Sequence, residues 1–188
     1  MPRIILPSRS RQKDNVFLQP WLETQLKERQ DRTSATLQPP VFNFIPKLPE
    51  KEMTKPHTST QILRNPCHFV KITKFYKVDA FKVFASVRDD KYQILVEFTP
   101  HCVSEFERRH RSRITYDTVN SVCIIGDCKL FYKDRLYVLQ NYNLDITSFK
   151  TTTNRILQRV PVLVVNQISR FEMDQVDSLD QYPFVYTV

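Results

Sequence analysis

The stretch FKVFASVRDDKYQILVEFTPHCVSEFERRH, from Phe81 to His110, decides the fold class of this chain. Apolar and polar side chains alternate over its first eight residues and again over Tyr92–Phe98, which is typical of strands with one buried face. Asp89 and Asp90 fit a short hairpin turn between them, although the glycine that such turns favour is missing. Pro100 then opens a helix, and Val103 and Phe106 lie on it at helical spacing. The apolar face of the first strand carries Phe81, Val83, Ala85 and Val87.

Further strand patterns lie on both sides of this stretch. Cys67–Val78 is rich in β-forming residues, and Val119–Tyr132 is a long strand pattern with a bulge or sharp bend at Gly126-Asp127. Beyond them the sequence predicts alternation over Leu136–Ile146, a short helix over Thr151–Gln158, and strands over Val160–Val165 and Ile168–Phe171. Three strands, one helix and then long strands is the order of an OB-fold, so we expect an all-β chain with short helices. The expected architecture is a single five-stranded barrel with one helix between strands 3 and 4.

The N-terminal third has a different character. Residues 1–15 are basic and are expected to be loose, and residues 16–29 predict a short helix with Pro20 in its first turn and Trp21 on its apolar stripe. Residues 31–66 hold six of the 12 prolines, which predicts an extended arm that packs across a surface. The expected organisation is a loose terminus (1–15), a helix with a Pro-rich arm (16–66), and an OB-fold domain with a C-terminal extension (67–188).

Composition excludes several classes of enzyme. The 188 residues contain 13 Phe and 8 Tyr, enough to form a core, but a single glycine, Gly126. Walker loops, Rossmann fingerprints and nucleophile elbows need several glycines, because only glycine lets the backbone approach a phosphate or turn so sharply. A small hydrolase is a hypothesis that this count disfavours.

The remaining chemistry-bearing residues form no recognisable site. The four cysteines, Cys67, Cys102, Cys123 and Cys128, show no CxxC spacing, so we expect free, mostly buried and inert thiols, no metal site and no cofactor. No stretch approaches the ~20 apolar residues of a membrane span, which predicts a soluble protein of a reducing compartment.

The net charge of +8 raises the question of nucleic acid. Arg108, Arg109 and Arg111 form the densest basic cluster, which either contacts phosphates or is a solvated helix end whose charge opposes the macrodipole. Lys74 and Tyr76 belong to a run of interleaved lysines and aromatics, which either stacks bases or packs the core. Both alternatives stay open from the sequence.

Several longer motifs resemble one protein family. They are VFLQPW at 16–21, NPCHFVKITKFY at 65–76, QILVEF at 93–98, CVSEFER at 102–108, IIGD at 124–127 and PFVY at 183–186. Together they resemble the telomere replication protein family, the small accessory subunits of budding-yeast telomerase known as the third "ever shorter telomeres" proteins. The resemblance covers nearly the whole chain and is weak over 22–52 and 133–159.

The resemblance implies a single OB-fold similar to the telomerase-recruiting OB domain of mammalian shelterin. It implies a non-catalytic telomerase subunit in the nucleus, at the chromosome telomere. The implied partners are the N-terminal domain of the reverse transcriptase and the large regulatory subunit, with the telomerase RNA met indirectly. The telomerase-binding positions that carry over are Trp21, Lys71, Asp89, Phe106, Glu107, Arg113, Thr118, Asn120 and Asp174. Asp117 and Glu52 stand where the family pattern has the other acidic residue.

Some of these positions have a structural alternative. Trp21 either contacts telomerase or holds the N-terminal helix on the barrel, and Arg113 and Lys71 are alternatively internal ion-pair partners, for example of Asp174. The competing function is an OB-fold protein that binds single-stranded DNA or RNA with its groove, at the telomere or on telomerase RNA.

Overall fold

The computed structural model describes residues 18–29, 40–55, 65–115, 118–119, 121–151, 156–172 and 182–187. Within these ranges the fold is mostly β with four short helices, and it is OB-like. The strands are β1 (Val41–Ile45), β2 (Phe69–Asp79), β3 (Lys82–Arg88), β4 (Gln93–Phe98), β5 (Val122–Asp134) and β6 (Arg159–Glu172). The helices are α2 (Leu22–Arg29), α3 (Glu50–Thr54), α5 (Pro100–His110) and α6 (Arg135–Tyr142), with short 3₁₀ turns at Pro66–His68, Ile146–Ser148 and Val185–Thr187.

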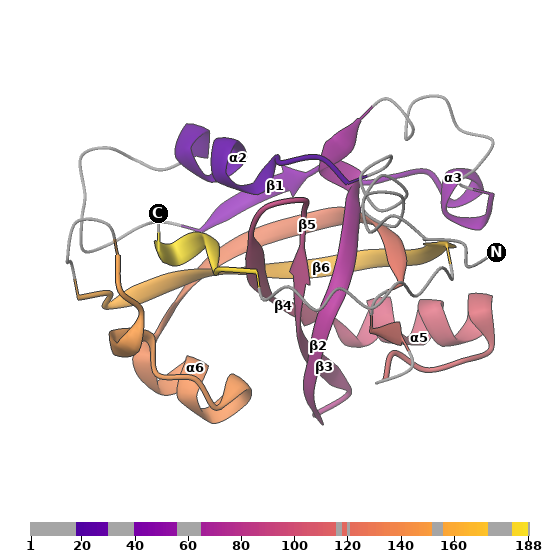
Figure 1. Ribbon diagram of the computed structural model, residues 1–188. Coiled ribbons are helices and arrows are strands. Elements are labelled where there is room, and N and C mark those ends of the chain that lie inside the picture. The colour runs from indigo at the N-terminus through magenta and orange to yellow at the C-terminus, as the bar shows by residue number, and fades with distance from the viewer. Residues whose placement is uncertain are drawn as a thin grey trace, which may run out of the picture.

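The six strands form one sheet in the order β1-β5-β2-β3-β4-β6. β5 pairs with β6 as well as with β2, so the pairing that runs from β2 through β3, β4 and β6 returns to β5. All pairings between named strands are antiparallel except that of β4 with β6, which is parallel. Figure 1 shows α2 and α5 on opposite sides of the strands, with α6 beside the lower end of β5.

The β2–β3–β4–α5 stretch follows the sequence prediction. Strands lie at the expected places, and α5 follows β4 with Thr99 accepting a hydrogen bond from the backbone N–H of Cys102 as its N-cap. β3 differs in one respect: both of its faces are buried, because Phe84, Ser86 and Arg88 are covered by other parts of the chain. Phe81 lies in the turn before β3 and is 82% exposed, so its expected place on the apolar face is wrong.

The strand predicted over 136–146 is wrong, because this segment forms α6 and a 3₁₀ turn. Asp134 caps the helix by accepting from the backbone N–H of Tyr137, and Asn143 ends it in the left-handed region with φ 54°. Val138 and Tyr142, four residues apart, are the buried pair that holds it on the sheet. Part of the helix predicted over 151–158 lies outside the described residues, and 156–158 are not helical.

The sequence predicts a bulge or sharp bend at Gly126-Asp127, but β5 runs through these residues without a break and keeps its register with β6. The local irregularity is the backbone of Asp127, which lies in the left-handed region with φ 49°. β6 is one continuous strand rather than two. The N-terminal helix begins at Leu22, so Pro20 precedes it. The apolar side of this segment is buried as expected, with Trp21 next to Leu22 and Leu26. Within the described residues, no helix is long and apolar enough to span a membrane.

Candidate functional site

Asp89 connects the N-terminal helix to the turn between β3 and β4. It is fully buried, and its Oδ2 accepts hydrogen bonds from the backbone N–H groups of Trp21 and Leu22, both at 2.8 Å. Its Oδ1 accepts from the N–H groups of Lys91 and Tyr92 at 2.7 and 2.8 Å. The first pair satisfies donors at the start of α2, and the second closes the hairpin turn. One buried carboxylate thus holds four backbone donors.

Trp21 is equally internal. Its side chain is 4% exposed, and its indole Nε1–H donates to the backbone carbonyl of Phe69 at 3.2 Å. With its own N–H bound to Asp89, this residue fastens the start of α2 to β2 and to the β3–β4 turn. The contacts match the structural alternative that the sequence left open for Trp21.

Three more of the expected binding residues are buried. Lys71 lies in β2 and Thr118 precedes β5, where its hydroxyl donates to the carbonyl of Thr115 at 2.6 Å. Phe106 points from α5 into the core, with its ring 4.5 Å from that of His110. None of these side chains is accessible to a partner in this conformation. Glu52 lies in α3 and is half-buried.

Among the expected binding residues that the structure describes, Glu107 and Arg113 reach the surface. Their side chains are 42% and 81% exposed, and Arg113 Nε lies 3.7 Å from Glu107 Oε1. Both lie at the C-terminal end of α5 or just beyond it. Asp117, Asn120 and Asp174 lie outside the described residues, so the pairing of Asp174 with Lys71 or Arg113 stays a prediction.

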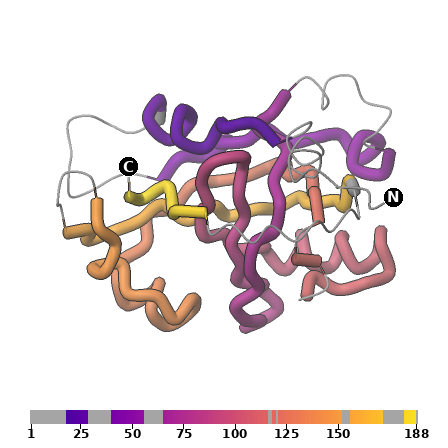
Figure 2. The backbone as a smooth tube through the Cα atoms, in the orientation of Figure 1, coloured from indigo at the N-terminus to yellow at the C-terminus, as the bar shows by residue number. Residues whose placement is uncertain are grey.

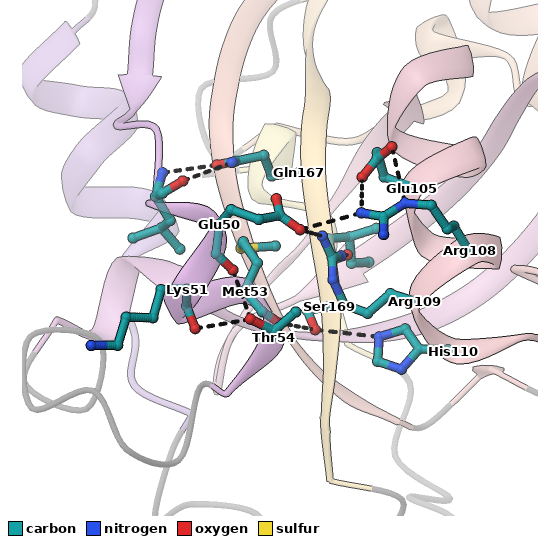
Figure 3. A network of polar contacts seen from close by, with 12 residues as sticks. Glu50, Lys51, Met53, Thr54, Glu105, Arg108, Arg109, His110, Gln167 and Ser169 are labelled. Atoms are coloured by element: carbon teal, nitrogen blue, oxygen red, sulfur yellow. Dashed lines mark hydrogen bonds and ion pairs between the residues drawn. The ribbon is translucent and has the colours of Figure 1, made fainter.

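Two residues of the basic run are held by carboxylates (Figure 3). Arg108 pairs with Glu105 at 2.6 Å and with Glu50 of α3 at 3.4 Å, and Arg109 pairs with Glu50 at 3.1 Å. The Arg109 side chain is 9% exposed and also donates to a backbone carbonyl of β6 at 3.2 Å. Arg111 is exposed and caps α5 in the left-handed region with φ 52°. Arg108 and Arg109 therefore bind the arm to α5, which favours a structural role over phosphate contact.

His110 adds a further contact between α5, β6 and α3. Its Nε2 accepts from the backbone N–H of Arg170 at 3.0 Å and lies 3.3 Å from Ser169 Oγ, whose hydroxyl donates to the carbonyl of Met53 in α3. Burial, followed by the charges of Arg170 and Arg109, lowers the pKa of His110 to about 4. The imidazole is thus neutral near pH 7, as an Nε2 acceptor must be.

The outer face of β2 and β3 is covered by the protein itself near Lys74 and Tyr76. Tyr76 is half-buried, and its ring packs edge-on against Tyr142 of α6 at 5.3 Å, while Phe84 meets Tyr142 at 5.5 Å. Exposed Lys74 lies over the ring of Tyr76 with Nζ 5.0 Å from its centroid. Tyr76 therefore presents little free ring surface on which a base could stack.

The C-terminal segment covers the neighbouring part of this face. Figure 2 shows residues 182–187, in yellow, beside the β3–β4 hairpin. The guanidinium of Arg88 stacks 4.1 Å from the ring of Tyr182, and the backbone N–H of Gln93 donates to the carbonyl of Pro183 at 3.0 Å. Tyr186 donates from its hydroxyl to the carbonyl of Pro161 at 2.6 Å.

Three of the four cysteines are buried, and Cys67 is half-buried. All four are free, and burial raises the pKa values of Cys102, Cys123 and Cys128, that of Cys123 to about 12. A thiol with so high a pKa is a poor nucleophile. In the described part of the chain, no group of three His, Cys, Asp or Glu side chains is placed to hold a metal ion.

Two structural contacts escaped the sequence analysis. Glu50 looked like one more arm residue, yet it pairs with two arginines of α5. The side-chain amide of Gln167 forms two hydrogen bonds with the backbone of Leu48. It accepts from the N–H of Leu48 and donates to the carbonyl of Leu48, both at 2.8 Å. Long-range contacts of this kind leave no periodic signal in a sequence.

The sequence of this chain is similar to those of known proteins. The telomere replication protein EST3 of Candida glabrata is 40% identical over 186 residues, which make up 99% of this chain and 98% of the relative. The EST3 protein of Eremothecium gossypii is 37% identical over 98% of this chain and 89% of its own length. The chain belongs to the EST3 family. Residues 18–186 of this EST3-family chain also match the family described as "Shelterin complex subunit, TPP1/ACD".

A solved structure agrees in fold. The Est3 telomerase subunit of the yeast Hansenula polymorpha aligns with a TM-score of 0.52 and 18% identity, covering 84% of this chain and 86% of that one. The EST3 family is the one that the sequence motifs indicated, so that resemblance is confirmed.

Proposed function

We propose that this EST3-family chain is a non-catalytic regulatory subunit of the telomerase holoenzyme, needed for telomere maintenance in the nucleus. It binds the N-terminal domain of the reverse transcriptase and the large regulatory subunit, and it promotes recruitment or activation of the enzyme at chromosome ends. Family membership supports the proposal, since the relatives are named telomere replication proteins and one solved relative is named a telomerase subunit. We assign β2–β6 as the five-stranded OB barrel and β1 as a strand added to it.

The binding surface that we propose lies at the C-terminal end of α5. The observation that carries it is the exposed pair formed by Glu107 and Arg113, whose side chains lie 3.7 Å apart, whereas Phe106 and Thr118, nearby in the sequence, are buried. Asp117 and Asn120 belong to this segment by sequence. The rim of a specific protein interface is typically polar and accessible to solvent, as this pair is.

The buried members of the expected set act through the fold. Asp89 and Trp21 hold α2 in place, and Phe106 fixes α5 on the sheet. Substituting them removes telomerase binding by disturbing the scaffold, whereas substituting Glu107 or Arg113 leaves the scaffold intact.

The test is co-precipitation of telomerase RNA and activity with tagged protein. We compare wild type with Glu107→Ala and with Glu105→Ala, a matched control because Glu105 is on the same helix and pairs with Arg108. A third variant, Lys74→Ala/Tyr76→Ala, probes the OB groove. Circular dichroism establishes that each variant is folded.

We expect Glu107→Ala alone to lose telomerase. Loss with Glu105→Ala to the same degree would show a general charge effect and contradict the proposed surface. Loss with Lys74→Ala/Tyr76→Ala and retention with Glu107→Ala would favour the alternative function, an OB-fold protein whose groove binds nucleic acid.

A further inference from the structure

Lysines and aromatic rings alternate along the outer side of β5. Lys129 Nζ lies 5.9 Å from the centre of the Phe42 ring in β1, and Phe42 meets Phe131 edge-on at 6.1 Å. Lys133 Nζ lies 5.3 Å from the ring of Phe131 and 4.4 Å from that of Tyr137 in α6. These five residues, which we name the lysine–aromatic stripe, form one continuous chain of contacts over β1, β5 and α6.

The stripe is open to solvent. Phe42 is 58% exposed, Lys129 is exposed, and the other three members are partly exposed. A Phe side chain with more than half of its surface in water contributes little to the core. The stripe therefore contains exposed aromatic surface that the fold does not need.

In the described part of the chain, no carboxylate pairs with either lysine of the stripe, and both lysines lie over ring faces. Arg108 and Arg109 differ, because Glu50 and Glu105 neutralise them. Of these basic groups, Lys129 and Lys133 are the ones available for an anionic ligand.

We propose that the lysine–aromatic stripe binds single-stranded nucleic acid. Residues 129, 131 and 133 recur about 6.6 Å apart along the strand, a spacing suited to the successive bases of an extended strand. Lysines would contact phosphates while the exposed ring of Phe42 offers a stacking surface. The apolar groups in the stripe are all aromatic, which suits bases better than the aliphatic side chains of an amphipathic peptide.

The stripe lies away from the surface that we propose for telomerase binding, so both could be occupied at once. Figure 1 shows α6 and α5 at opposite ends of the molecule, so nucleic acid on the stripe would leave the end of α5 free. The inference is independent of the proposed telomerase contact, because it is tested on the purified chain with no telomerase present.

The test measures fluorescence anisotropy of labelled 20-nucleotide oligo(U) RNA and oligo(dT) DNA with the full chain over a series of salt concentrations. We expect Lys129→Ala/Lys133→Ala to weaken binding by about tenfold and to reduce the salt slope by about 1.4, since each phosphate contact on a single strand contributes about 0.7. Phe42→Leu weakens binding at least about fivefold because it removes a stacking surface, and Phe42→Tyr retains it. Comparison of the RNA and DNA affinities shows which type of nucleic acid the stripe prefers.

The matched control is Lys74→Ala/Lys77→Ala, which removes two charges from β2, where each lysine also lies over an aromatic ring. This variant should bind nearly as wild type. Equal loss in both double variants, or no binding by the wild type, would overturn the proposal. We expect poly-glutamate to displace neither oligonucleotide. If the chain bound poly-glutamate in preference to the oligonucleotides, the ligand would instead be an acidic protein.

Discussion

The backbone N–H of Trp21 donates a 2.8 Å hydrogen bond to Oδ2 of Asp89, across 68 positions of sequence. Two residues that the family resemblance assigns to telomerase binding are thus bonded to each other inside the protein. The same carboxylate accepts from three further backbone N–H groups. A substitution at either residue therefore acts first on the attachment of α2.

Asp89→Ala should lower the free energy of unfolding by about 3 kcal/mol, because buried backbone donors lose a charged acceptor. Urea unfolding followed by tryptophan fluorescence measures this directly, since Trp21 is the single tryptophan. Asp89→Asn keeps one carbonyl oxygen and should be less damaging. An Asp89→Ala protein as stable as wild type that still loses telomerase would show that Asp89 contacts the partner itself.

Gly126 should not tolerate a side chain. A Cβ at this position would lie 2.5 Å from Gln167 Oε1 and 3.1 Å from Leu48 Cγ, and that Gln167 oxygen is the one that accepts from the N–H of Leu48. Gly126→Ala is expected to destabilise the protein by about 1–2 kcal/mol and to speed hydrogen exchange at the Leu48 amide. In a double-mutant cycle with Gln167→Ala, the double variant should lose less stability than the sum of the losses in the two single variants. Full additivity would exclude the clash.

Exchanging the charges of Glu107 and Arg113 separates an internal role from an interface role. The exposed pair contributes little to stability, so Glu107→Arg should change Tm by only about 1–2 °C while reducing recovered telomerase RNA about tenfold or more. The swapped double variant, Glu107→Arg/Arg113→Glu, restores the internal pair but not the pattern that a partner meets. Recovery of telomerase by the swap would mean that the pair serves the fold alone.

Acid should weaken the contact between the arm and α5. The pKa of His110 falls from 6.5 to about 4 in the folded protein, so the unfolded chain binds the proton more readily. The stability that neutral His110 contributes is complete above pH 6.5 and is lost as the pH falls toward 4. Burial also lowers the pKa of His68, which adds to the same trend. Thermal unfolding from pH 7 to 4 should show a smaller fall for His110→Gln than for wild type, and an equal fall would contradict this role.

Periodicity predicted the part of the fold that obeys local rules. The run from β2 to α5 shows clear alternation followed by a helix with a Thr99 cap and a proline at its start. The segment 136–146 also alternates, yet Asp134 and Asn143 cap a helix there. Short apolar runs fit either period, and tertiary burial of Val138 and Tyr142 decides between them.

The candidate site was less predictable for a different reason. Motifs identified the family, but they could not separate buried residues from exposed ones. Asp89 stands at a hairpin turn, where an exposed side chain is the usual expectation, and it is buried because α2 packs over it. The pairing of Glu50 with Arg109 likewise joins residues 59 positions apart. Only the assembled fold shows which expected binding residues can meet a partner.

Replacing Phe81 should stabilise the fold. Ala80 and Phe81 form the two-residue turn between β2 and β3 with φ values of 50° and 64°, a left-handed conformation that costs a side-chain-bearing residue about 1 kcal/mol or more. Phe81 is 82% exposed, so packing does not offset this strain. Phe81→Gly is expected to raise Tm by about 2–4 °C, and Ala80→Asn/Phe81→Gly, the preferred sequence for such a turn, should raise it further. Phe81→Leu keeps the strain and serves as the control; a rise in Tm as large as that of Phe81→Gly would show that the exposed ring, not the backbone, is the source of the instability.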